Sequence, residues 1–123
     1  MESILNSIKK LLGGMTNVKD SEGNYFFDDD LIIHINSVLN VLTQLGVGPS
    51  DGYCIKDEND TWEDFIGSDS TLIQMVKTYV YLRVRQIFDP PSSSSVEKAS
   101  KEVMDELEHR IILSLEVLPE LDE

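Results

Sequence analysis

Three adjacent carboxylates, Asp28, Asp29 and Asp30, come nearest in this sequence to a metal-binding motif. Carboxylate oxygens are the ligands that Ca²⁺ prefers in proteins. However, the calcium-loop pattern D-x-[DN]-x-[DN]-G is absent, and no glutamate follows at the spacing that closes such a loop. The run directly precedes a strong helical pattern. We therefore predict that Asp28 or Asp29 caps that helix and that the other carboxylates interact favourably with its dipole.

The other side chains that often do chemistry stand without partners. His34 and His109 are far apart, and His34 has no histidine or carboxylate one turn further along its helix. Cys54 is the only cysteine, which excludes an intrachain disulfide, and we expect a small half-buried side chain in a loop or short strand. Ser92–Ser95 lack an activating base, and the glycines form no nucleotide-binding motif. We therefore predict a protein that is not an enzyme and that uses no metal and no cofactor.

Composition narrows the class of protein further. The chain has 123 residues, 41% of them hydrophobic, which is enough for the core of one domain. Its formal net charge of −13 argues against nucleic-acid binding through phosphate neutralisation. Solvated acidic faces and a wall that repels DNA phosphates are both compatible with this charge. No apolar run spans a bilayer, and the N-terminal segment lacks the order of a signal peptide, so we expect a soluble intracellular protein.

Apolar periodicity divides the chain into helices. It predicts main helices over Glu2–Leu12, Asp29–Leu45, Ser70–Phe88 and Ser95 to about Leu115, and one short helical turn over Thr61–Ile66. The 46–60 segment is rich in turn formers and long for a compact domain, which favours contact with a partner. We therefore predict an all-α fold, a small bundle of about four helices with a long loop between the second and third main helices. Residues 1–115 form the single domain, and residues 116–123 form an acidic C-terminal tail.

Burial is predicted from the same pattern. The 70–88 helix is apolar on almost every side, which is typical of a central helix or of one that other chains partly cover. Trp62 is expected to close the open end of the helical core, with a subunit interface as the alternative. The last helix carries a regular apolar stripe expected to face the core: Val96, Ala99, Val103, Leu107, Ile111 and Leu115.

Three cations stand out on the apolar 70–88 helix: Lys77, Arg83 and Arg85. Such long side chains must reach solvent or pair with carboxylates. Pairing within the fold and pairing with the acidic surface of another copy are both open, and contact of an arginine with DNA is a third reading. The candidate partners within the fold are Asp64, Asp89 and Glu106.

A fixed connection follows this helix. Pro90 and Pro91 cannot continue it, because each lacks a backbone N–H and its ring clashes with the preceding turn. Ser94 and Glu97 then have the S-x-x-E spacing of a capping box that starts the next helix. The sequence therefore predicts two helices joined by a rigid corner.

Several segments, taken in order, resemble a known family. They are Leu31–Val38, Gln44–Pro49, Trp62–Gly67, the Tyr-Leu-Arg-Val-Arg run at 81–85, and Phe88-Asp89-Pro90-Pro91 with its serine-rich cap and acidic helix. The set, spanning roughly Asp28 to Leu113, resembles the head–tail connector (adaptor or head completion) proteins of tailed bacteriophages. No single segment is specific, but their order and spacing are.

The resemblance implies a structural role in virion assembly and DNA packaging. Such connectors form a ring of about a dozen copies below the portal protein, extend the DNA channel and dock a tail-proximal stopper or tail completion protein, and head-to-tail contacts close such a ring. DNA passes through without specific binding. The resemblance implies a protein of the virion at the head–tail interface, present in the host cytoplasm during assembly.

Charge segregation then suggests where copies meet. A head-to-tail ring needs two unlike complementary faces on each subunit. We expect subunit-interface residues on the cationic helix, on the acidic last helix and at the open end of the core: Tyr81, Arg83, Arg85, Glu102, Glu106 and Trp62. The alternative function is a monomeric regulatory or adaptor module that binds one protein through the 46–60 loop.

Overall fold

The structure, a computed structural model, describes residues 2–88 and 93–121. The helices are α1 (Ile4–Leu12), a 3₁₀ turn η1 (Gly14–Thr16), α2 (Asp28–Gln44), α3 (Trp62–Ile66), α4 (Ser70–Phe88) and α5 (Ser94–Leu121). The described residues form no β-strand and only two isolated bridges, Ser3–Thr61 and Lys19–Tyr25. The predicted all-α fold is therefore confirmed. The Pro90–Pro91 corner lies outside the described residues.

Short polar side chains cap the starts of several helices by accepting hydrogen bonds from backbone N–H groups of the first turn. The Ser3 side chain accepts a hydrogen bond from the Asn6 N–H at 3.2 Å, and Gly13, with φ of 87°, ends α1. Thr61 and Asp64 form a reciprocal capping box at the start of α3. Asp69 accepts hydrogen bonds from two N–H groups in the first turn of α4. The predicted starts of these helices follow from such short polar side chains.

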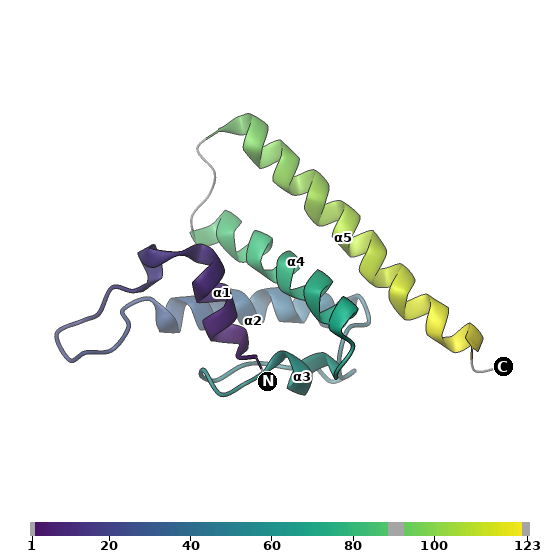
Figure 1. Cartoon of the computed structure of the whole chain (residues 1–123), viewed down its shortest axis with the longest axis horizontal. Coiled ribbons are helices and arrows are strands. Elements are labelled where there is room, and N and C mark those ends of the chain that lie inside the picture. Colours follow the sequence, from purple (N-terminus) through teal and green to yellow (C-terminus); the bar gives the residue numbers. More distant parts are fainter. Residues whose placement is uncertain (1, 89–92, 122–123) are drawn as a thin grey trace.

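Helix α4 lies at the centre of the bundle and contacts α1, α2, α3 and α5. Figure 1 shows α5 on one side of α4 and α2 on the other, with α1 crossing beside them. The fully buried side chains of α2 and α4 include Leu31, Ile35, Leu39, Leu42, Val76, Tyr79, Val80 and Val84. These residues form one continuous core with Trp62 of α3 and Ile111 of α5.

Three predicted helix ends are wrong. Phe27, not an aspartate, occupies the cap position of α2, and Asp28 instead pairs with Lys9, whose Nζ lies 2.8 Å from Asp28 Oδ1. The acidic first turn still complements the helix dipole.

At α5 the hydroxyl of Ser93, one residue before the predicted capping box, accepts a hydrogen bond from the Val96 N–H at 3.4 Å. Helix α5 also runs to Leu121, since leucines at helical spacing continue its pattern beyond residue 115.

Burial of α4 agrees with the predicted central helix, whereas burial of the first half of α5 differs from the prediction. The apolar surface of α4 is largely covered by α1, α2 and α5, and its most exposed large hydrophobic side chain is Ile87, at 55%. On α5, Val96 and Val103 are 48% and 44% exposed, and Ala99 is exposed as well. Of the predicted stripe, Ile111 is buried and Leu107 and Leu115 pack against the core as expected, and Met104, which lies outside the stripe, is buried as well. On these two helices the exposed large apolar side chains are Ile87, Val96, Val103 and Leu113, so most of them lie on α5.

Tyr79 fixes α5 on α4 through a polar contact inside the fold. Its hydroxyl donates a hydrogen bond to Glu108 Oε2 at 2.9 Å, and its side chain is fully buried. The Arg83 guanidinium carbon lies 5.7 Å from the centroid of the Tyr79 ring. Burial, and then the hydrogen bond to Glu108, raise the pKa of Tyr79 to about 12.

This shift predicts a loss of stability at high pH. An unfolded tyrosine titrates near pH 10, so the extra stability from Tyr79 is fully present below pH 10 and is lost as pH rises to about 12. We expect the free energy of unfolding, measured with urea at pH 9 to 12, to fall less steeply for Tyr79→Phe than for the natural chain. Tyr53, whose burial also raises its pKa to about 12, accounts for part of the remaining slope. Equal slopes for the two proteins would contradict this role of Tyr79.

Candidate subunit interface

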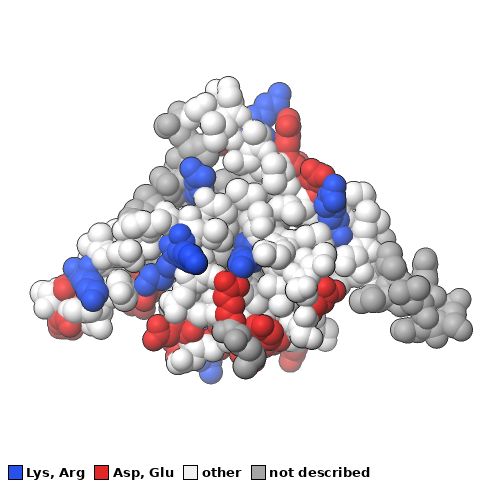
Figure 2. Space-filling model, viewed as in Figure 1, with Lys and Arg blue, Asp and Glu red and all other residues white. Residues whose placement is uncertain are grey.

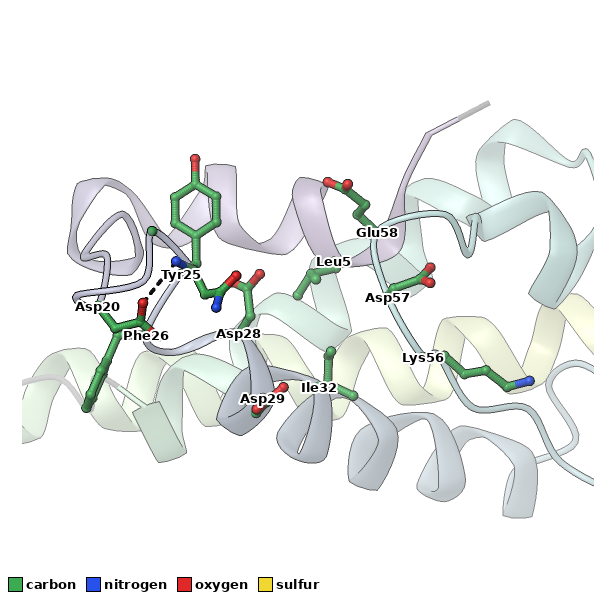
Figure 3. Close-up of a pocket in the computed structure, with 12 residues that line it drawn as sticks. Leu5, Asp20, Tyr25, Phe26, Asp28, Asp29, Ile32, Lys56, Asp57 and Glu58 are labelled. Atoms are coloured by element: carbon green, nitrogen blue, oxygen red, sulfur yellow. Dashed lines mark hydrogen bonds between the residues drawn. The ribbon is translucent and has the colours of Figure 1, made fainter.

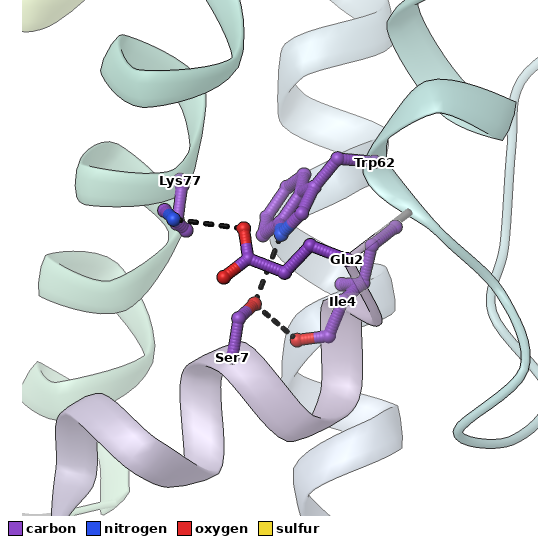
Figure 4. Close-up of polar contacts among 5 residues, drawn as sticks. All are labelled: Glu2, Ile4, Ser7, Trp62 and Lys77. Atoms are coloured by element: carbon purple, nitrogen blue, oxygen red, sulfur yellow. Dashed lines mark hydrogen bonds and ion pairs between the residues drawn. The ribbon is translucent and has the colours of Figure 1, made fainter. Parts of the chain in front are cut away.

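Trp62 belongs to the core of the protomer. Its side chain is fully buried, and its indole N–H donates to Ser7 Oγ at 2.9 Å, while the Ser7 hydroxyl donates to the Ile4 carbonyl at 2.9 Å. Figure 4 shows this chain of contacts joining α3 to α1, beside the ion pair between Lys77 and Glu2 at 2.8 Å. A side chain with no exposed surface cannot contact a neighbouring copy. Trp62 therefore closes the core of its own protomer, as expected, and the alternative position at a subunit interface does not apply.

The two candidate arginines of α4 lie on different sides of the helix. Residues two apart do not face each other on a helix, and the contacts of Arg83 and Arg85 agree with this. Arg83 lies over Tyr79, on the side that packs against α5, whereas Arg85 donates to the hydroxyl of Tyr81 at 3.3 Å. Among the described residues, neither arginine has a carboxylate within 4 Å. The structure thus brings Tyr81 and Arg85 together and separates Arg83 from them.

The acidic candidates lie beside an apolar strip on α5. We call Val96, Ala99 and Val103 the α5 stripe; these residues are three and four apart, so they follow one side of the helix. Glu102 and Glu106 are exposed and lie three residues beyond Ala99 and Val103, so they border the stripe. Glu106 pairs with Arg110 of its own helix at 2.8 Å, with both side chains at least 60% exposed. The arrangement is an apolar strip with a charged edge, which is the usual composition of a protein interface.

A second apolar surface lies on the 17–27 loop. Phe26 is 60% and Val18 is 50% exposed, and the Phe26 N–H donates to the Val18 carbonyl at 2.8 Å. Asp20 fixes the turn by accepting from the N–H groups of Glu22 and Asn24 at 2.9 and 3.0 Å. The signal that could have revealed this surface is the consecutive aromatic run Tyr25-Phe26-Phe27.

A groove of about 580 Å³ separates the 17–27 loop from the tip of the 46–60 loop. Figure 3 shows Asp29, Asp57 and Glu58 around this groove, with Leu5 and Ile32 between them. Tyr25 forms one wall, and Lys9 lies 3.6 Å from the centroid of its ring while pairing with Asp28. In the part of the chain that is described, no group of three or more histidine, cysteine or carboxylate side chains could hold a metal ion.

The 46–60 loop has a fixed shape. The Asn36 side chain accepts from the Ile55 N–H at 2.8 Å and donates to the Ile55 carbonyl at 3.1 Å. The sequence alone does not reveal this role of Asn36, because it depends on the backbone of a residue 19 positions away. Ile55 is buried, whereas Cys54 next to it is exposed rather than half-buried as expected. Alternation along an extended segment explains this difference.

Charge is unevenly distributed over the surface. Figure 2 shows carboxylates gathered along the lower edge, over α3 and the loop that precedes it, and a row of both signs along α5. Cationic side chains lie on the left and central parts of the same face. Within the described part of the chain, no helix has the length and hydropathy needed to cross a membrane.

Comparison with known proteins gives one match. A family model with the description Phage connector protein matches residues 4–117 of the chain. No curated protein and no solved structure matches. The family match covers all of the helices apart from the last residues of α5, and it confirms the resemblance drawn from the ordered segments between residues 28 and 113.

Proposed function

Because the chain belongs to the phage connector protein family, we propose that it forms a ring of about a dozen copies below the portal protein. The ring extends the DNA channel of the particle and presents a docking surface to a tail-proximal stopper or tail completion protein. Family membership indicates a structural protein of the phage head–tail region rather than an enzyme. The match over residues 4–117 is the observation that carries this proposal.

Features of the surface support self-assembly. The α5 stripe and the 17–27 loop both expose large apolar side chains, and exposed apolar patches of this kind mark interaction sites. Arg85 on α4, whose guanidinium contacts the Tyr81 hydroxyl, and Glu102 and Glu106 on α5 provide opposite charges for a head-to-tail contact. Arg83 is a weaker candidate, since it lies against Tyr79 of its own protomer.

The charge of the chain supports passage of DNA without binding. A net charge of −13 gives little attraction for phosphates, so DNA can move along a channel of such subunits without being held. The ring assembles in the host cytoplasm and remains in the virion at the head–tail interface.

Co-sedimentation with the portal ring of the same phage tests the proposal. We expect the protein to sediment with the portal at a fixed ratio of about one connector per portal subunit, whether or not it forms rings alone. A portal from an unrelated phage is the control and should retain none. A protein that stays monomeric at all concentrations, and that never sediments with the matching portal, would favour the monomeric adaptor module acting through the 46–60 loop.

A further inference from the structure

The 17–27 loop is built to keep its shape while it exposes apolar side chains. Its backbone is closed by hydrogen bonds between Asp20 and Asn24 and between Phe26 and Val18, both at 2.8 Å. Lys9 and Lys19 lie on the Tyr25 ring at 3.6 and 5.1 Å from its centroid. An ordered loop with Phe26 and Val18 at least half exposed has the character of a preformed contact element, because little entropy is lost when it binds.

The loop is continuous with the charged surface of α4. The Phe26 and Phe27 rings meet edge to face at 5.0 Å, and the Phe27 and Phe88 rings do so at 5.3 Å. Phe88 is three residues beyond Arg85 and therefore its neighbour on the surface of α4. Phe26, Phe27 and Phe88 thus form a row of aromatic rings that leads from the loop to the end of α4 that carries Arg85.

The α5 stripe has the complementary character. Val96 and Val103 are exposed by 48% and 44%, and Glu102 borders them with a carboxylate. Figure 1 shows the 17–27 loop projecting at the left of the molecule and α5 lying along its upper right side. The loop and the helix that carries the stripe are therefore separate parts of one protomer, and a head-to-tail contact needs two unlike surfaces on each copy.

We infer that the 17–27 loop of one copy packs on the α5 stripe of a second copy, with Phe26 and Val18 against Val96 and Val103 and with Arg85 near Glu102. The inference rests on the proposed ring and names the two surfaces that close it. Aromatic side chains at the centre of an interface commonly supply most of its binding energy. The charges at the edge fix the orientation of the copies.

Cross-linking tests which surfaces meet. In a Cys54→Ser background, Val18→Cys and Val103→Cys are combined in one chain, and the assembled protein, with portal added if the chain alone stays monomeric, is treated with a short bismaleimide. We expect a ladder of covalent oligomers. A mixture of the two single-cysteine variants should give dimers only, because each chain then has one reactive face. A control pair, Val18→Cys with Asn40→Cys on the exposed side of α2, should cross-link at least tenfold less.

A matched pair of substitutions on α5 tests the apolar contact. Val103 and Leu113 are 44% and 45% exposed on the same helix, but only Val103 belongs to the stripe. We expect Val103→Ser and Val18→Ser to raise the concentration needed for assembly at least tenfold and Leu113→Ser to leave it unchanged, with equal far-UV circular dichroism in all three. Rings that form, but that give no cross-link in the Val18→Cys, Val103→Cys chain and do not respond to Val103→Ser, would overturn the inference and leave the ring intact. Absence of any oligomer, with and without portal, would overturn both.

Discussion

Replacing Trp62 with alanine should lower the free energy of unfolding by about 3–5 kcal/mol, the range found for large aromatic side chains removed from a core. Trp62 is fully buried and belongs to the same core as Ile4, Tyr79 and Ile111. Its loss leaves a cavity where α3 meets α1. Since small domains have about 5–15 kcal/mol of stability in total, urea unfolding should detect the change easily.

The polar part of this contact can be separated from the packing part. Trp62→Phe keeps an aromatic ring in the core but removes the N–H whose hydrogen bond Ser7 Oγ accepts, together with part of the ring volume. Ser7→Ala instead leaves the buried indole N–H without an acceptor, which costs about 1–3 kcal/mol. Both should cost less than Trp62→Ala. A loss below about 1 kcal/mol for Trp62→Ala would show that the tryptophan does not hold the core together.

A further consequence concerns the N-terminal helix. The segment before α1 pairs with the segment before α3, where the Ile4 N–H donates to the Asp60 carbonyl at 3.0 Å and the Trp62 N–H donates to the Glu2 carbonyl at 3.2 Å. Helix α1 is therefore attached through the same few residues as α3. In Trp62→Ala we expect amide hydrogen exchange to accelerate first in α1, before α2 and α4 are affected.

The elements that sequence could predict are those whose signals are local. Ser3, Gly13 and Thr61 act on helix ends within three or four residues of themselves, so α1 and α3 were located correctly. The Ser70–Phe88 helix was predicted from apolar residues that recur along its whole length. The order of several weak motifs similarly indicated the family, which the match over residues 4–117 confirms.

What sequence could not predict depends on partners distant in the chain. Periodicity identified the apolar residues of α5, but whether a helix face is covered depends on how far its neighbour reaches, and α4 covers Met104 and Ile111 rather than Val96. The pairing of Asp28 with Lys9 displaced its expected capping role in the same way. The exposure of Phe26 on the 17–27 loop likewise depends on the hydrogen bond between Phe26 and Val18, eight residues apart, which no local pattern predicts.

Reversing the charge of Arg85 should affect assembly and spare the fold. Arg85 interacts with the Tyr81 hydroxyl on the surface of α4 and, in the part of the chain described, has no carboxylate partner within 4 Å. If it faces Glu102 of the next copy, Arg85→Glu places two carboxylates together. A loss of about 1.4 kcal/mol or more at each contact then raises the concentration needed for assembly at least tenfold. Sedimentation velocity over a concentration series measures this concentration.

Arg83 provides the matched control, because it differs from Arg85 in the side of α4 on which it lies. Arg83→Glu brings a carboxylate beside Tyr79 and the acceptor Glu108, so it should lower the free energy of unfolding and leave the contact between copies without a specific defect. Combining Arg85→Glu with Glu102→Lys restores opposite charges across the proposed contact and should recover assembly, whereas Glu102→Lys alone should not. If the double variant does not recover assembly although both single variants are folded, Arg85 and Glu102 do not meet across the contact. Equal effects of Arg83→Glu and Arg85→Glu on assembly would instead mean that net charge, rather than a particular pair, controls how the copies associate.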